Sequence, residues 1–274
     1  MIEPAKIDDV TFPPSGEGVP EPWFRHAVPF LAPLLLVCLF VAASQLSLVL
    51  ERGRGAIIVT AAVLVTALGA IASFYLARSW RHSIPPAVLC LGAFGFVLIV
   101  ESGLARYGIT LAVAVLVAAF LSRLERHGEG AELSGADNER LVMMLLAPAA
   151  FFMLSFAFAA VEITSVPAWQ MAGPVALLAA FIIGEMTWRA APDKRLGPLI
   201  PATAAVLAAE IFIALSVLPV RHVVNGAVAA ILLSLVAHKV RDELVSDSNP
   251  LQFRRHAALS VLLVVIILVT AQWL

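Results

Sequence analysis

The chain has 274 residues, of which 61% are hydrophobic and only 14% are charged, and its mean hydropathy is +0.95. A soluble domain of this length usually carries about 25% charged and 45–50% apolar residues, so the apolar excess excludes a single soluble core. The net charge of −1 gives no reason to expect a nucleic-acid partner. Arginine outnumbers lysine, which favours a bacterial source and hence a bacterial inner membrane.

Residues 1–25 are expected to form a cytoplasmic tail. The segment is rich in proline, glycine and acidic residues, a composition that cannot form a packed core and predicts disorder. The rest of the chain, residues 26–274, is expected to be one transmembrane helical domain.

Long apolar runs follow this tail. A hydrocarbon core of about 30 Å requires roughly 20 residues per helix. The runs predict an all-α, polytopic membrane helix bundle of about nine transmembrane helices, at 28–49, 56–77, 84–101, 107–122, 141–161, 170–188, 198–218, 222–238 and 257–274. The fourth run is short, and a thinned bilayer would have to accommodate it. The lipid bilayer is thus the first expected partner.

The basic residues predict the orientation of the chain. With the N-terminus in the cytoplasm, 14 of the 18 Lys and Arg residues fall in inner segments, and the outer segments hold the remaining four, Arg52, Arg54, Arg106 and Arg221. Such an excess of cytoplasmic positive charge is typical of multi-pass proteins of the cell membrane. The odd number of spans then places Leu274 outside.

The predicted spans pair into hairpins that resemble one another. Each even-numbered span ends in basic residues, and the first three outer turns begin with Glu51, Glu101 and Glu162. This pattern favours four consecutive helical hairpins plus a terminal helix. Duplication and the ordinary charge rule both explain the likeness, and the sequence leaves both open. The inner loop 123–140 separates a four-span half from a five-span half.

Glu210 is the main candidate for an intramembrane functional residue. At about 1.5 Å per residue from Pro198, it lies roughly 18 Å along its span, near the middle of the bilayer. A carboxyl group is costly at this depth, so we expect it to face the bundle interior or water, with small residues such as Ala204 and Ala208 packing nearby. It is either a proton or cation site, or a hydrogen-bonding group that joins neighbouring helices.

Other acidic residues provide weaker candidates. Glu185 and Arg189 are four residues apart on one predicted helix, a spacing that favours an ion pair near the inner face. Glu51, Glu101 and Glu162 mark the outer ends of three spans, where they either form an acidic mouth that collects cations or are simply solvated at the headgroups.

The sequence contains no motif that binds a cofactor or a metal. It lacks the glycine-rich phosphate loops, the dinucleotide fingerprint and the nucleophile elbow. Its six histidines show no metal-ligand spacing. Cys38 and Cys90 both lie in apolar runs and are expected to be small buried side chains. We therefore predict no cofactor, no metal site and no catalytic residue.

Three functions remain open. The leading one is a non-enzymatic membrane scaffold or complex subunit, whose partner is a membrane protein or a second copy of the chain. The second is a transporter or channel for a cation or small solute that uses Glu210. The third is an enzyme acting on a lipid-linked substrate at the inner face, where arginine and histidine side chains could hold phosphates.

Overall fold

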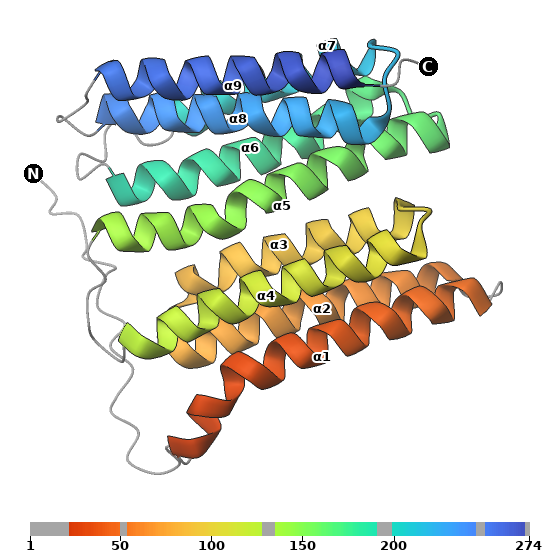
Figure 1. The fold of residues 1–274 in the computed structure, drawn as a ribbon, viewed down its shortest axis with the longest axis vertical. Helices are drawn as coiled ribbons and strands as arrows, with labels where there is room; N and C mark the ends of the chain where they lie inside the picture. Colours follow the sequence, from red (N-terminus) through yellow and green to blue (C-terminus); the bar gives the residue numbers. More distant parts are fainter. Residues whose placement is uncertain (1–21, 50–53, 128–134, 191–198, 245–249, 272–274) are drawn as a thin grey trace, which may run out of the picture.

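The computed structural model describes residues 22–49, 54–127, 135–190, 199–244 and 250–271. Within these ranges the chain forms nine helices and no strand, as Figure 1 shows. The helices are α1 (Pro22–Val49), α2 (Arg54–Ala77), α3 (Trp80–Ile99), α4 (Gly103–His127), α5 (Gly135–Thr164), α6 (Ala168–Ala190), α7 (Leu199–Ser216), α8 (His222–Leu244) and α9 (Pro250–Thr270).

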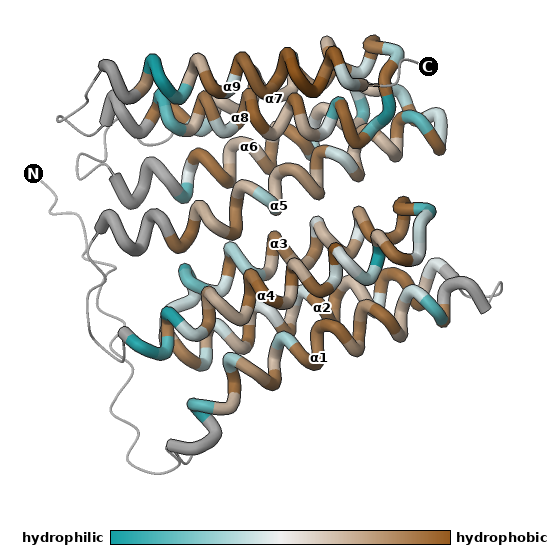
Figure 2. The backbone as a smooth tube through the Cα atoms, in the orientation of Figure 1, coloured by the Kyte–Doolittle hydropathy of each residue, from teal (hydrophilic) through white to brown (hydrophobic). Residues whose placement is uncertain are grey.

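The predicted fold class, a polytopic membrane helix bundle, is confirmed. Each of the nine helices contains an apolar segment of at least 18 residues, which is long enough to cross a bilayer. Large hydrophobic side chains such as Phe30, Leu104 and Val217 point out of the bundle. Figure 2 shows that apolar residues dominate the middle of the helices and that polar residues gather toward their ends. Lipid is therefore the solvent of this surface.

Several helices extend further than the hydropathy predicted. The fourth span is not short, because α4 has 25 residues and continues through Arg126. Much of the expected inner loop 123–140 is also helical, since α4 ends at His127 and α5 begins at Gly135. Charged residues at a helix end can leave the hydrocarbon while the backbone stays helical. The predicted spans are therefore too short on both sides of this loop, whereas the predicted span 198–218 extends beyond the observed end of α7 at Ser216.

The helix packing divides α1–α8 into two units of four helices. In α1–α4, the second helix packs most extensively against the third, and the first packs against the second and fourth. In α5–α8, α6 packs most extensively against α7, and α5 packs against α8 and α6. We call α1–α4 the first repeat and α5–α8 the second repeat. The repeating unit is therefore two hairpins long rather than one.

The sequence carries the same repeat with a constant spacing of 115 residues. This spacing separates Leu31-Ala32-Pro33 from Leu146-Ala147-Pro148, and it also separates Arg106 from Arg221. Gly69 of α2 faces Pro86 of α3, and 115 residues later Gly184 of α6 faces Pro201 of α7. The same residue types thus make the same helix contact in both repeats.

Helix α5 joins the two repeats. Its side chains enter both hydrophobic cores: Leu145 and Ala149 pack with the first repeat, and Leu146 and Ala150 pack with the second. Two glycines allow this close contact. A Cβ atom on Gly92 of α3 would lie 2.7 Å from Met153 Cγ, and one on Gly226 of α8 would lie 2.1 Å from Ser155 Oγ.

Helix α7 of the second repeat and the terminal helix α9 are less covered. Helix α9 packs mainly on α8, and none of the described residues in its spanning segment is buried. In α7 only Ala204, Ala208 and Phe212 are buried, whereas more than half of the equivalent span in α3 is buried. The face of α3 that meets α5 therefore has an uncovered counterpart on α7.

Candidate functional site

A polar cavity lies at the end of the first repeat where α3 is followed by α4. It has a volume of about 280 Å³ and lies between α1, α3 and α4. Its lining contains six polar or charged side chains, Ser44, Gln45, Glu101, Arg106, Tyr107 and Thr110, together with Val41, Val97 and Gly103. Small-molecule sites typically combine an enclosed volume of this order with a few convergent polar groups.

Hydrogen bonds position several of these side chains. Gln45 Nε2 of α1 donates to Tyr107 Oη of α4 over 3.1 Å, which ties the two helices together beside the cavity. The hydroxyls of Ser44 and Thr110 donate to backbone carbonyls of their own helices, at 2.9 and 2.8 Å. Both side chains are buried. The polar floor of the cavity is thus held in a fixed arrangement.

Two opposite charges line this cavity without binding each other. Arg106 is held by its Nε, which donates to the carbonyl of Val100 where α3 ends. Glu101 is exposed and forms no hydrogen bond or ion pair with any side chain that the structure describes. An arginine–glutamate ion pair would neutralise both groups, so their separation leaves one anionic and one cationic group at the cavity.

Glu162, another predicted outer acid, does not join Glu101. Glu162 of α5 lies in the second repeat, where its Oε2 accepts from the backbone N–H of His222 at 3.3 Å and lies 2.9 Å from His222 Nδ1. Glu162 therefore caps the beginning of α8. Glu51 lies outside the described residues, so a shared acidic mouth of the three acids stays a prediction.

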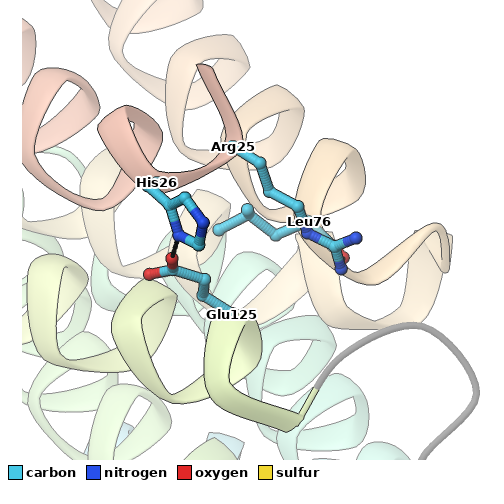
Figure 3. A network of polar contacts seen from close by, with 4 residues as sticks. All are labelled: Arg25, His26, Leu76 and Glu125. Atoms are coloured by element: carbon cyan, nitrogen blue, oxygen red, sulfur yellow. Dashed lines mark hydrogen bonds and ion pairs between the residues drawn. The ribbon is translucent and has the colours of Figure 1, made fainter. Parts of the chain in front are cut away.

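The opposite end of the first repeat, where α1 begins and α4 ends, carries a second polar contact. Figure 3 shows His26 of α1 facing Glu125 of α4, with a hydrogen bond between His26 Nδ1 and the carboxylate. Beside it, Arg25 donates to the carbonyl of Leu76 in α2 at 3.4 Å. His26 is 74% exposed, so this contact fastens helix ends in a solvent-accessible position rather than forming an enclosed site.

Glu210 does not face the bundle interior. It is exposed on α7, next to the exposed side chains of Val206 and Ile213. The buried residues Ala204 and Ala208 confirm the predicted packing of small residues. Each residue rotates a helix by about 100°, so Glu210, two residues after Ala208, points about 200° away from it. The small-residue seam therefore turns Glu210 outward.

The predicted pair in α6 lies at the limit of the described side chains. Glu185 is partly exposed, and the side chain of Arg189 lies outside the described residues. Both belong to α6, one helical turn apart. Their ion pair stays a prediction.

Cys38 is exposed on α1, contrary to the expectation, because it lies on the side of the helix that faces away from the bundle. Cys90 is buried, as expected.

A larger apolar cavity lies where the two repeats meet. It has a volume of about 330 Å³ and lies between α2, α3, α5 and α6. Apolar residues such as Phe94, Met153 and Leu178 line it. The cavity offers no hydrogen-bonding side chain, so its chemistry is restricted to apolar contact.

Sequence reasoning identified Glu101 as a candidate, but not the cavity that it shares with Ser44 and Gln45. The missing information was the contact of α1 with α4, which brings Gln45 to Tyr107. Arg106 had been counted only as one of four outer basic residues. Its 115-residue spacing from Arg221 was the signal that could have marked both as members of a repeat.

Comparisons with known proteins returned no relative. No protein-family model and no curated protein matches the sequence, and no solved structure matches the fold. The function has to be inferred from the arrangement of the residues themselves.

Proposed function

We propose that this chain is a non-enzymatic subunit of a membrane-protein complex and that the exposed face of α7 binds another protein. The proposal depends on one observation, the exposed carboxyl group of Glu210 near the middle of a membrane-spanning helix. Glu210 is eleven residues from Leu199, about 16 Å along the axis and close to the midplane of a 30 Å core. A carboxyl group facing lipid there is costly.

The internal repeat supports a helical occupant for this face. The 115-residue spacing makes Gly95 of α3 the counterpart of Glu210. A Cβ atom on Gly95 would lie 3.2 Å from Phe156 Cγ, so α5 covers that position closely in the first repeat. In the second repeat no described helix covers the equivalent position. A transmembrane helix from another chain would complete the same packing.

The chemistry of Glu210 favours a partner helix that carries a Lys, Arg or His side chain near its middle. An intramembrane acid is stabilised by an opposite charge or by hydrogen-bond donors. A second copy of this chain cannot offer such a cation, because its described basic side chains, for example Arg106, Arg126 and Lys239, lie near helix ends. Two copies would instead have to bury two carboxyl groups together.

Site-specific photo-crosslinking tests this proposal. A benzophenone amino acid replaces Val206 or Ile213 on α7 in native membranes. It replaces Val59 or Val63 on α2 as a matched control, since these two are 63% and 62% exposed on a helix without an acid. The expected result is one adduct from the α7 positions only, whose mass spectrum identifies a transmembrane helix with a central cation.

A charge exchange completes the test. Glu210→Lys should abolish the α7 adduct, and an acidic residue in place of the partner's cation should restore it. Equal labelling from α2 and α7, an adduct with a second tagged copy, or no adduct would each contradict the proposal. Because Glu210 points away from the bundle interior, it does not support the transporter hypothesis.

The orientation forms part of the proposal. We place the N-terminus in the cytoplasm and the C-terminus outside, in a bacterial cell membrane. The described basic residues support this choice: Arg78, Arg81, Arg123 and Arg126 gather where even-numbered helices end, whereas Arg221 lies at the opposite end, at the beginning of α8. The positive-inside rule assigns the more basic end to the cytoplasm.

A further inference from the structure

The polar cavity of the first repeat is lined by several polar side chains that the fold does not require. The second repeat has the same packing of four helices, yet at the positions 115 residues later Ala159, Ala160 and Ser216 replace Ser44, Gln45 and Glu101. Ala159 is fully buried. These three polar side chains are therefore not needed to build a unit of this kind, whereas Arg106, Tyr107 and Thr110 have polar counterparts in the second repeat.

The second repeat also fills the corresponding space with aromatic rings. Phe212 of α7 occupies the position where the first repeat has Val97, and its ring packs at a tilt against Phe158 of α5 with a ring-centroid distance of 4.3 Å. Val97 is much smaller and lines the polar cavity. Compared with the second repeat, the cavity thus has a smaller side chain at position 97 and more polar side chains in its lining. Both differences favour a bound ligand.

We propose that this cavity binds the charged part of a zwitterion, a molecule that carries both an ammonium and an anionic group. The guanidinium of Arg106 provides the contact for the carboxylate or phosphate, and arginine suits such planar or multidentate recognition. The carboxylate of Glu101 provides the contact for the ammonium. Gln45 and Tyr107, already bonded to each other, add neutral hydrogen-bonding groups between α1 and α4.

The charges of Glu101 and Arg106 are not paired with each other, which favours a ligand that carries both a positive and a negative charge. Glu101 and Arg106 line the same cavity without forming an ion pair. A ligand with one charge would satisfy one residue and leave the other unpaired. A zwitterion satisfies both at once, and the volume of about 280 Å³ is at the small end of the range for ligand pockets. The ligand is either a small amino-acid-like solute or the headgroup of a zwitterionic phospholipid.

Calorimetry on the full chain tests the proposal. The protein is reconstituted in nanodiscs of phosphatidylglycerol, which has no ammonium group, and titrated with phosphoethanolamine and with glycine. We expect saturable binding of at least one zwitterion and at least about tenfold weaker binding of ethanolamine and inorganic phosphate. Loss of a hydrogen bond to a charged group corresponds to a change of about this size.

Two variants localise the binding to the cavity. Glu101→Gln and Arg106→Gln should each weaken zwitterion binding at least about tenfold. Glu162→Gln is the matched control, because it removes an outer acid from the second repeat, and its binding should equal that of the wild type. Glu101 has no partner among the described side chains, so its substitution leaves the fold intact; a melting curve for each variant verifies this.

A second lipid composition distinguishes the two sources of ligand. If the site holds a lipid headgroup, nanodiscs that contain phosphatidylethanolamine should suppress binding of the soluble zwitterion by competition. If it holds a solute, binding should be equal in both lipids. The proposal is overturned if no zwitterion binds saturably, if ethanolamine or phosphate alone binds equally well, or if Glu101→Gln binds like the wild type.

Discussion

The contact of α5 with α8 predicts a large effect from a single methyl group. In Gly226→Ala the new Cβ would lie 2.1 Å from Ser155 Oγ, 2.6 Å from Ser155 Cα and 2.7 Å from its backbone nitrogen. Since two of these three atoms belong to the backbone, no side-chain rotation relieves the contact. The two helices have to separate instead, within the interface that holds the second repeat together.

The magnitude follows from two opposing contributions. Overpacking a well-packed contact costs about 1–3 kcal/mol, and replacing glycine by alanine inside a helix recovers up to about 1 kcal/mol. We therefore expect a net loss of about 1–2 kcal/mol in the free energy of unfolding. At about 2–4 °C per kcal/mol, the melting temperature should fall by about 2–8 °C.

Cys90 provides the assay. It is fully buried, whereas Cys38 is exposed. In a Cys38→Ala background, a thiol-reactive dye should therefore become fluorescent only when the protein unfolds in detergent. The matched control is Gly173→Ala in α6, because a Cβ atom there meets nothing within 4 Å. Its melting temperature should equal that of the background or rise slightly.

Two further variants distinguish backbone contact from side-chain contact. Adding Ser155→Ala to Gly226→Ala should not restore stability, because the backbone atoms of residue 155 remain in place. Gly92→Ala should cost less, since its closest neighbour is Met153 Cγ on a flexible side chain. If Gly226→Ala melted like Gly173→Ala, the close approach of α5 and α8 would be refuted.

Three other predictions concern topology, cysteine access and the contact of His26 with Glu125. Reporter tags fused to Met1 and Leu274 should report opposite sides of the membrane, and tags on the same side would contradict an odd number of spans. In folded protein in detergent, a hydrophobic maleimide should label Cys38 before Cys90, and equal rates would contradict the packing of α3. His26→Ala should lower the free energy of unfolding by less than about 1 kcal/mol, as measured by its melting curve, because an exposed ion pair contributes little.

The sequence predicted the spans because lipid imposes a simple requirement on them. Each helix has to cross the hydrocarbon with apolar residues, so hydropathy identifies its middle. It could not identify the ends of α4, whose last turns contain Arg123 and Arg126. The hydropathy pattern assigns such residues to a loop, although a helix that extends beyond the hydrocarbon can carry charged residues.

The candidate site depended on contacts between distant segments. Ser44 lies on α1, Glu101 lies in the turn between α3 and α4, and Arg106 lies on α4. Only the packing of α1 against α3 and α4 places them around one cavity. For Glu210 the sequence indicated the depth but not the direction. Its depth follows from the position along α7, whereas its direction depends on which side of α7 meets α6.

The even number of helices in each repeat has a consequence for how such a chain can grow. A unit of four spans returns the polypeptide to the side of the membrane from which it entered. A second unit therefore inserts in the same orientation, and the orientation of the later segments does not change. Helix α9 is then the one described element that carries the C-terminal end across the bilayer. Because no described residue of its spanning segment is buried, the side on which the chain ends is set independently of both cores.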